Sequence, residues 1–222
     1  MDKVVWFLTG NEGKLEEARQ HFASLGILVE GLSVPEGEIV EPQADNLLDV
    51  ATAKIQQALN HLPSEGSMVL VEDAGLFVSA LNGFPGVYSS YAYETIGCQG
   101  MVKLLSHLES EDPVQAKKLR ACTFEAVAAL WDGERILYGH GTCPGSLSAE
   151  MHGEGGFGFD PIFVPWDLDE GGVPLPPETL GALSTHGQTF ASVDVQTKHA
   201  FSHRRRALDD LLRQLPPDVT GS

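Results

Sequence analysis

The sequence predicts an α/β fold in which a mixed, twisted sheet is flanked by helices. The first observation is the opening stretch, where apolar strand-like runs alternate with amphipathic helical segments. Such alternation is typical of a sheet covered by helices. The second observation is a pair of β-rich runs joined at Asp132-Gly133, the strongest short-range hairpin signal. A hairpin adds antiparallel pairing, so the sheet is not purely parallel.

The first strand and helix are predicted at the start of the chain. Residues 4–8 are an apolar run that ends at Thr9-Gly10, which predicts a buried strand. A helix is expected from Lys14 onward, because apolar residues recur there at helical spacing. Those residues are Leu15, Ala18 and Phe22, with Glu16, Glu17 and Gln20 on other faces.

A second unit of the same kind follows. Residues 27–34 are a strand candidate, and residues 46–62 carry the apolar periodicity of a helix. Another buried strand begins at residue 68 and is expected to break at Glu72-Asp73. The chain therefore opens with β-α-β units.

The second half of the chain is less regular. Residues 167–187 are rich in Gly and Pro without periodicity, which predicts a long surface loop. Residues 202–215 predict a helix with Ser202 as its N-cap. We expect residues 1–215 to form one domain and residues 216–222 a flexible tail.

Charge restricts the class of partner. The chain has 31 acidic and 14 basic residues, a net charge of −17 at pH 7. Nucleic acids and anionic membranes need positive surface, so neither is an expected partner. Cys98, Cys122 and Cys143 have neither metal-site nor disulfide-framework spacing, and no apolar run reaches the length of a signal peptide or membrane span. A soluble cytoplasmic protein is the expectation.

The turn before the first helix, "TGNEGK", raises the possibility of a phosphate site. Thr9 and Asn11 carry polar side chains, and Gly10 and Gly13 allow backbone N–H groups to converge on an anion at a helix N-terminus. Lys14 would add a full charge. The loop is two residues shorter than a Walker A loop and lacks its hydroxyl after the lysine. A plain βα turn remains the alternative.

A carboxylate pair lies where the third strand is expected to end. Ligands of open α/β sheets bind beyond the carboxyl ends of strands, which is where Glu72 and Asp73 would be. Successive strand residues face opposite ways, so both can share a site only if the chain turns at Asp73-Ala74-Gly75. Two carboxylates beside phosphates would suit Mg²⁺. The alternative is a solvated turn.

Two further stretches are unusual. In "GEGGFGFDP", glycines allow close backbone approach to a ligand, and Phe157 and Phe159 could stack on a planar base. The alternative is a tight loop with core aromatics. In "SHRRR", three arginines oppose the dipole at a helix N-terminus, and a bound anion or polar ligand edge would offset this. Only one of Arg204, Arg205 and Arg206 is expected in a site; the alternative is a solvated helix face.

Taken in order, these motifs resemble the inosine triphosphate pyrophosphatase family, also called Ham1-like or XTP/dITP pyrophosphatases. The order is TGNxGK, VED-x-GL, GxPGVYS, GEGGFGFDP, TFA and K-x-A-x-SHR, from Thr9 to Leu215. The resemblance implies hydrolysis of the deaminated purine nucleoside triphosphates ITP, dITP and XTP to the monophosphate and pyrophosphate. It also implies Mg²⁺, two lobes around a central substrate cleft, and a homodimer.

The resemblance implies roles for individual residues. Asp73 would accept a proton, and Lys14 and Lys54 would stabilise charge on the leaving pyrophosphate. Glu41, Asp73 and Glu72 would be the metal residues. The substrate-binding residues would be Thr9, Gly10, Asn11, Glu12, Gly13, Lys14, Lys54, Ala74, Phe157, Gly158, Phe159, Asp160, Lys198, His203 and Arg204.

Two departures from the family pattern stand out. Ala74 occupies a position where the family more often has Ser or Thr, so a side-chain hydroxyl contact is lost. The loop over residues 167–187 is longer than usual. Two other activities remain open, a pyrophosphatase for another modified or pyrimidine nucleotide and a nucleotide-binding protein without turnover.

Overall fold

The computed structural model describes residues 3–23, 25–64 and 66–215; the predicted tail over residues 216–222 lies outside these ranges. Neighbouring strands follow the order β2-β1-β3-β5-β6-β7, with β4 paired to β3. β1 is parallel to both β2 and β3, whereas β3–β4 and β6–β7 are antiparallel. The expected α/β class with a mixed sheet is confirmed.

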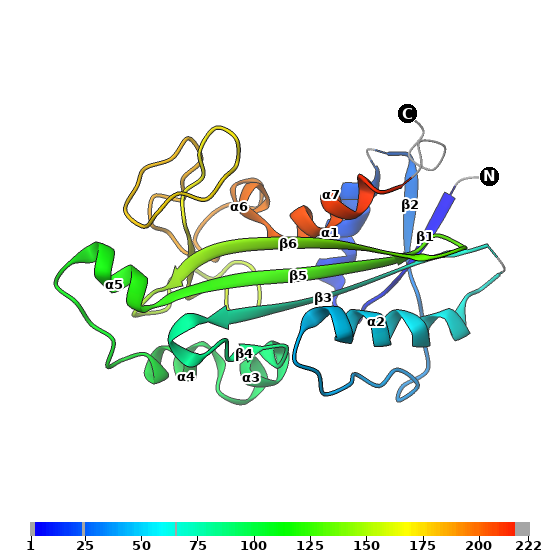
Figure 1. The fold of residues 1–222 in the computed structure, drawn as a ribbon, viewed down its shortest axis with the longest axis horizontal. Helices are drawn as coiled ribbons and strands as arrows, with labels where there is room; N and C mark the ends of the chain where they lie inside the picture. The colour runs from blue at the N-terminus through cyan, green and yellow to red at the C-terminus, as the bar shows by residue number, and fades with distance from the viewer. Residues whose placement is uncertain (1–2, 24, 65, 216–222) are drawn as a thin grey trace. The chain divides into compact units, whose positions relative to one another are not determined.

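The elements are as follows (Figure 1). The strands are β1 Lys3–Leu8, β2 Ile27–Gly31, β3 Met68–Val78, β4 Pro85–Gly86, β5 Ala121–Trp131, β6 Ile136–Leu147 and β7 Phe163–Pro165. The α-helices are α1 Glu12–Ala23, α2 Leu47–Ala58, α3 Ser89–Thr95, α4 Gly97–Leu104, α5 Pro113–Leu119, α6 Val195–Phe201 and α7 His203–Leu212. Short 3₁₀ turns cover Leu59–His61 and Ser79–Leu81.

The chain divides into two compact units. The first comprises the residues up to Ala74, residues 126–141 and the residues from Arg204 onward. The second comprises residues 75–125 and 142–203. The single domain expected over residues 1–215 thus consists of two parts, and β3, β5 and β6 contribute residues to both.

In the first unit, helices cover both faces of the parallel strands. α1 and α7 lie on one face and α2 on the other (Figure 1). Alternate strand residues such as Val5, Phe7 and Leu70 pack with Phe22 of α1 and Leu211 of α7. Since side chains alternate across a strand, every second residue of β1 and β3 is available to each helical layer.

The predicted hairpin is confirmed between β5 and β6. Asp132 Oδ1 accepts hydrogen bonds from Glu134 N and Arg135 N, both at 2.9 Å, and Gly133 has a φ of 107°. A positive φ costs glycine little, which is why Asp-Gly forms this turn.

The expected break of the third strand at Glu72-Asp73 is wrong, because β3 continues without interruption to Val78. Gly75 does not form a turn. Its missing Cβ lets the backbone of Gly86 in β4 approach, since a Cβ there would collide with the Gly86 carbonyl. Ser89 Oγ strengthens this contact by accepting from Leu76 N at 2.8 Å and donating to Gly86 O at 2.7 Å. The extended course of β3 decides which way its carboxylates face.

In the second unit, apolar side chains of β3, β5, β6 and helices α3, α4 and α6 form a separate core, with Phe163 and Phe201 almost fully buried. Helices α3, α4 and α5 were not expected from the sequence. The predicted C-terminal helix begins at His203, directly after Ser202, and is preceded by the shorter α6. Among the described residues, no helix is long and apolar enough to cross a membrane.

Candidate active site

The turn Thr9–Lys14 is held by its own side chains. Thr9 Oγ1 accepts from Asn11 N, and Asn11 Oδ1 accepts from Lys14 N, each at 3.1 Å. Asn11 therefore acts as the N-cap of α1, which begins at Glu12, two residues earlier than expected. Lys14 lies in the first helical turn. The start of α1 thus combines backbone N–H groups, the partial positive charge of the helix dipole and the ammonium of Lys14.

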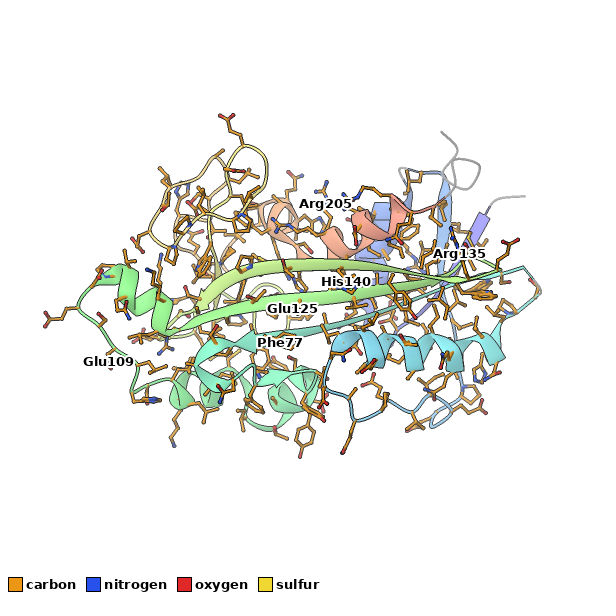
Figure 2. The ribbon with its side chains drawn as sticks, viewed as in Figure 1. Phe77, Glu109, Glu125, Arg135, His140 and Arg205 are labelled. Carbon is orange, nitrogen blue, oxygen red and sulfur yellow. The ribbon has the colours of Figure 1, made fainter. Side chains whose placement is uncertain are left out.

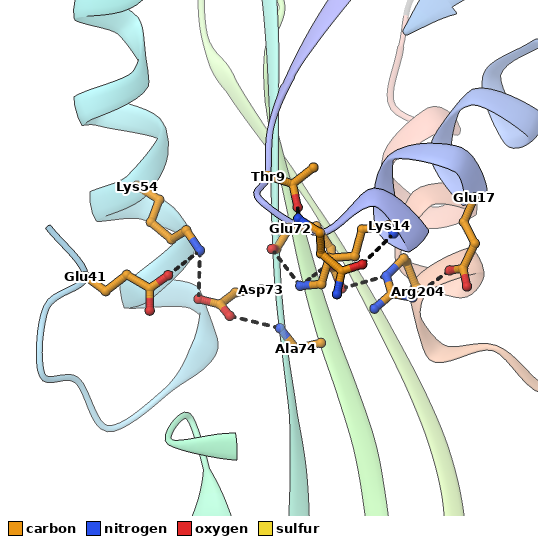
Figure 3. Close-up of polar contacts among 10 residues, drawn as sticks. Thr9, Lys14, Glu17, Glu41, Lys54, Glu72, Asp73, Ala74 and Arg204 are labelled. Atoms are coloured by element: carbon orange, nitrogen blue, oxygen red, sulfur yellow. Dashed lines mark hydrogen bonds and ion pairs between the residues drawn. The ribbon is translucent and has the colours of Figure 1, made fainter. Parts of the chain in front are cut away.

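Lys14 begins a chain of buried ion pairs. Its Nζ lies 2.7 Å from Glu72 Oε2 (Figure 3), and the Glu72 side chain has no exposed surface. Arg204 Nε lies 3.3 Å from Glu72 Oε1, and Arg204 Nη1 donates to Glu17 Oε2 at 2.6 Å. Burial opposes the charge on Arg204, but the Glu72 and Glu17 carboxylates outweigh it and raise the pKa of the guanidinium.

Glu17 belongs to this group, although the sequence pattern placed it only on a face of the helix other than the apolar one and gave it no role in the site. Its position three residues after Lys14 puts both side chains on neighbouring ridges of α1. The three-residue spacing from Lys14 is a sequence signal that places Glu17 near the site. It does not identify the cation with which Glu17 pairs. The partner, Arg204, comes from the far end of the chain.

A second cluster forms around Lys54 of α2. Lys54 Nζ donates to Glu41 Oε1 at 2.7 Å and lies 3.8 Å from Asp73 Oδ2 (Figure 3). Burial opposes the charge on Lys54, but Asp73 and Glu41 outweigh it and raise its pKa. Burial also raises the pKa of Asp73, and the attraction of Lys54 and Lys14 only partly offsets this. Asp73 is thus a carboxylate with a perturbed pKa beside two lysines, which is typical of functional sites.

Glu72 and Asp73 face different partners. Because β3 is extended at both residues, Glu72 points toward Lys14 and Arg204, and Asp73 points toward Lys54 and Glu41 (Figure 3). The turn at Asp73-Ala74-Gly75 that would bring both carboxylates to the same side does not form, because β3 continues through these residues. Of the three predicted metal residues, Glu41 and Asp73 lie together around Lys54, whereas Glu72 forms ion pairs with Lys14 and Arg204.

The residues present fit a magnesium ion in one respect. Four carboxylates face three cations across the two clusters, which are Glu17, Glu41, Glu72 and Asp73 against Lys14, Lys54 and Arg204. Among the described residues no three His, Cys, Asp or Glu side chains form a ready metal cage. Mg²⁺ is usually held by one or two carboxylates, substrate phosphates and water, so a pair such as Glu41 and Asp73 suits it.

In the second unit, the predicted base-binding loop is tied to Lys198 of α6. Asp160 Oδ2 accepts from Phe157 N at 2.8 Å and from Lys198 Nζ at 2.6 Å. The Lys198 ammonium also lies 4.7 Å from the centre of the Phe157 ring. Phe157 is 41% exposed, so its ring is available to a planar ligand.

Other predicted residues of this region have structural partners. Phe159 is only 3% exposed and packs edge-on against Tyr93, which speaks against a stacking role for its ring. His203 is buried and lies parallel to Phe124, with ring centres 4.8 Å apart. The Gly158 carbonyl accepts from the Cys98 thiol at 3.4 Å. In the first unit, Ala74 is partly buried, and its N–H donates to Asp73 Oδ1 at 3.1 Å.

The three consecutive arginines separate as expected. Arg204 is buried in its ion pairs, whereas Arg205 projects from the outer side of α7 (Figure 2) and lies 3.8 Å from Asp209. Arg206 is partly exposed. Only one arginine of the run therefore belongs to the candidate site.

These features define an α/β protein with a capped, lysine-bearing turn and ion-paired carboxylates, a combination suited to phosphate esters and anhydrides. The Ham1 family model matches residues 5–214, and the chain belongs to the Ham1 family.

Named relatives cover nearly the whole chain. A protein of Thermococcus kodakarensis named dITP/XTP pyrophosphatase is 41% identical over 96% of this chain and 97% of its own. One of Methanopyrus kandleri with the same name is 36% identical over 98% of both chains. Among solved structures, a HAM1 protein of Coxiella burnetii has a TM-score of 0.68 at 27% identity, covering 94% of this chain and 96% of its own.

Proposed function

We propose that this nucleoside triphosphate pyrophosphatase hydrolyses the deaminated purine nucleotides ITP, dITP and XTP to the monophosphate and pyrophosphate. The observation that carries the proposal is the position of Lys54 Nζ, 2.7 Å from Glu41 and 3.8 Å from Asp73. A lysine between two carboxylates, together with the helix-start Lys14, supplies the charges that a triphosphate and a cation need. The names of the relatives support the choice of substrates.

In this proposal Asp73 is the proton acceptor. Water attacks the α-phosphorus, an O–P bond forms, and the bond from that phosphorus to the bridging oxygen breaks. The water proton passes to Asp73 as pyrophosphate leaves. The raised pKa of Asp73 suits this task, because a more basic carboxylate is a better acceptor.

The cations of the site would stabilise the leaving group. Lys14 and Lys54 would face the charge that builds on the pyrophosphate, and the start of α1 would add its own partial charge. When bound by Glu41 and Asp73, Mg²⁺ would neutralise phosphate charge and acidify the attacking water. Glu72 would serve the same step indirectly by holding Lys14 and Arg204 in place.

Base selection would fall to the loop around Phe157. The exposed Phe157 ring would stack on the purine, and backbone N–H groups would pair with the 6-oxo group that distinguishes hypoxanthine and xanthine from adenine. Arg204 is proposed to contribute to the same preference. The pairing of Arg204 with Glu17 and Glu72 means that any such contribution depends on those carboxylates.

The test is pyrophosphate release from dITP, XTP, dGTP, dATP and dUTP, each with Mg²⁺ and with EDTA. We expect fast release from dITP and XTP with Mg²⁺, little from dGTP and dATP, and none with EDTA. Preferred release from dUTP would redirect the proposal to a pyrimidine nucleotide. Binding of dITP without any release would leave a nucleotide-binding protein.

The proposal includes a cytoplasmic homodimer. The resemblance to the family supports this assembly. Sedimentation equilibrium of the purified chain tests it, and we expect twice the mass of the 23.9 kDa chain.

A further inference from the structure

The long loop after β7 encloses a pocket within the second unit. The pocket has a volume of ≈ 400 Å³ and is lined mainly by residues of the stretch 165–187. Backbone hydrogen bonds hold the loop in a defined conformation. Leu168 N donates to Leu183 O at 2.9 Å, and Leu183 N donates to Leu168 O at 3.1 Å. Its course is visible as the yellow to orange stretch between β7 and α6 (Figure 1). A pre-formed pocket of this size is in the range of small-molecule sites.

One part of the pocket lining is apolar. Trp166, Pro176, Pro177 and Leu180 supply rings and aliphatic surface. Leu180 is 76% exposed, so its side chain is accessible to a ligand. These side chains favour a ligand with an apolar body.

The charged groups of the lining favour a cation. Asp167 and Glu178 are carboxylates, and Lys117 is the ammonium among them. Lys117 Nζ lies 2.6 Å from Glu178 Oε1. Asp167 Oδ2 accepts from the backbone N–H of Gly181 at 3.1 Å, and no ion pair of Asp167 is found among the residues that the structure describes. Anions would meet this negative lining and a chain of net charge −17, whereas cations are attracted by both.

We propose that this pocket binds a small amphipathic organic cation, an ammonium or guanidinium carried on an apolar body. The charged head would pair with Asp167 and lie near the indole of Trp166, an arrangement that combines an ion pair with a cation–π contact. The apolar body would lie among the prolines and Leu180. The site is additional to the pyrophosphatase function, and none of its residues takes part in the proposed hydrolysis.

The test follows the Trp166 indole N–H by NMR in the full chain. This N–H is buried and has no hydrogen-bond partner among the described residues, so its resonance should respond when the pocket fills. Trp166→Phe assigns the resonance. The probes are 2-phenylethylammonium, the neutral 2-phenylethanol and the anionic 3-phenylpropanoate, all at about pH 8, where the amine is protonated and the carboxylate ionised.

We expect a saturable shift with the ammonium, with a Kd at least about tenfold lower than that of the alcohol, and no saturation with the carboxylate. Asp167→Asn keeps the acceptor for Gly181 and should weaken ammonium binding about tenfold. Glu170→Gln, an exposed carboxylate of the same loop outside the lining, should leave Kd unchanged. Equal affinity for alcohol and ammonium, no shift up to about 20 mM, or full binding by a folded Asp167→Asn variant would overturn the proposal.

Discussion

Glu72 and Asp73 are neighbours in β3, but their carboxylates meet different lysines. Glu72 Oε2 lies 2.7 Å from Lys14 Nζ, and Asp73 Oδ2 lies 3.8 Å from Lys54 Nζ. The alternation of a strand thus assigns one carboxylate to the helix-start lysine and the other to the lysine of α2. This division predicts that substitution of Asp73 affects mainly turnover and that substitution of Glu72 affects mainly stability.

Asp73→Asn should abolish turnover and leave the protein folded. The amide keeps the shape of the carboxylate but cannot accept the water proton, so kcat should fall about 10²–10⁴-fold. Pyrophosphate release and circular dichroism measure the two properties. Asp45→Asn, an exposed carboxylate of the same unit, is the matched control and should retain full activity. Near-normal activity of Asp73→Asn would contradict the assignment of Asp73 as the proton acceptor.

Glu72→Gln should act mainly on stability. Loss of a fully buried carboxylate leaves Lys14 and Arg204 without their shared partner, and broken buried pairs cost about 3–5 kcal/mol. Urea unfolding measures this. Glu41→Gln is the comparison variant. The Glu41 side chain is 63% exposed, so this change should have little effect on stability and should alter the Mg²⁺ dependence of activity instead. If Glu72→Gln instead changed the Mg²⁺ dependence of activity and left stability unchanged, Glu72 would be a metal ligand and this account of its role would be wrong.

Arg204→Ala should lower both stability and selectivity, while Arg205→Ala should change neither. Arg204 balances Glu17 and Glu72, so its loss should cost about 3–5 kcal/mol and lower kcat/KM for dITP. Arg205 is exposed on the next position of α7 (Figure 2), which makes it a matched control. The measurements are thermal unfolding and the ratio of dITP to dATP hydrolysis. An unchanged ratio in Arg204→Ala would count against its part in base selection.

The raised pKa of Asp73 predicts a pH dependence of stability in the metal-free protein. Folded protein holds the Asp73 proton to higher pH than unfolded protein, whose carboxyl titrates near 3.8. The stabilisation from this proton is therefore complete below 3.8 and is lost as pH rises through the raised folded pKa. Asp73→Asn should remove this slope from urea unfolding measured with EDTA between about pH 4 and pH 7.

A second variant tests the cause of that shift. Lys54 lowers the pKa of Asp73 and partly offsets its burial, so Lys54→Met should raise the pKa further. NMR titration of the Asp73 carboxyl gives the value directly. A lower pKa in Lys54→Met would contradict the charge arrangement around Asp73.

The cysteines should be unreactive in the native protein. Cys98, Cys122 and Cys143 are buried thiols, and burial together with the nearby Asp160 raises the pKa of Cys98 to about 11. At pH 8 only about one Cys98 in 10³ would then be a thiolate, the reactive form. Iodoacetamide labelling followed by mass spectrometry should be slow until urea exposes all three thiols. Rapid native labelling would show that a thiol is accessible.

The local elements could be predicted because their signals are local. The periodicity of Leu15, Ala18 and Phe22 predicted α1, and Asp132-Gly133 predicted the hairpin. The course of β3 could not be predicted, because Gly75 is explained by Gly86, which approaches it from β4. Glycine in a strand marks either a bend or a close backbone contact, and only the contact partner distinguishes them.

The candidate site was predicted in composition but not in arrangement. Lys54, Glu41 and Asp73 come together as the resemblance implied. The tie between Glu17 and Arg204 depends on residues 187 positions apart, which no local pattern specifies. The burial of Phe159 also needed the structure, since alternating Gly and Phe does not reveal which ring faces the core.

The central claim is the attack of water on the α-phosphorus, and isotope labelling tests it most directly. dITP is hydrolysed by the enzyme with Mg²⁺ in H₂¹⁸O, and the products are analysed by ³¹P NMR and mass spectrometry. The mechanism predicts ¹⁸O in the phosphate of dIMP and unlabelled pyrophosphate. Label in pyrophosphate, or formation of dIDP with inorganic phosphate, would contradict it.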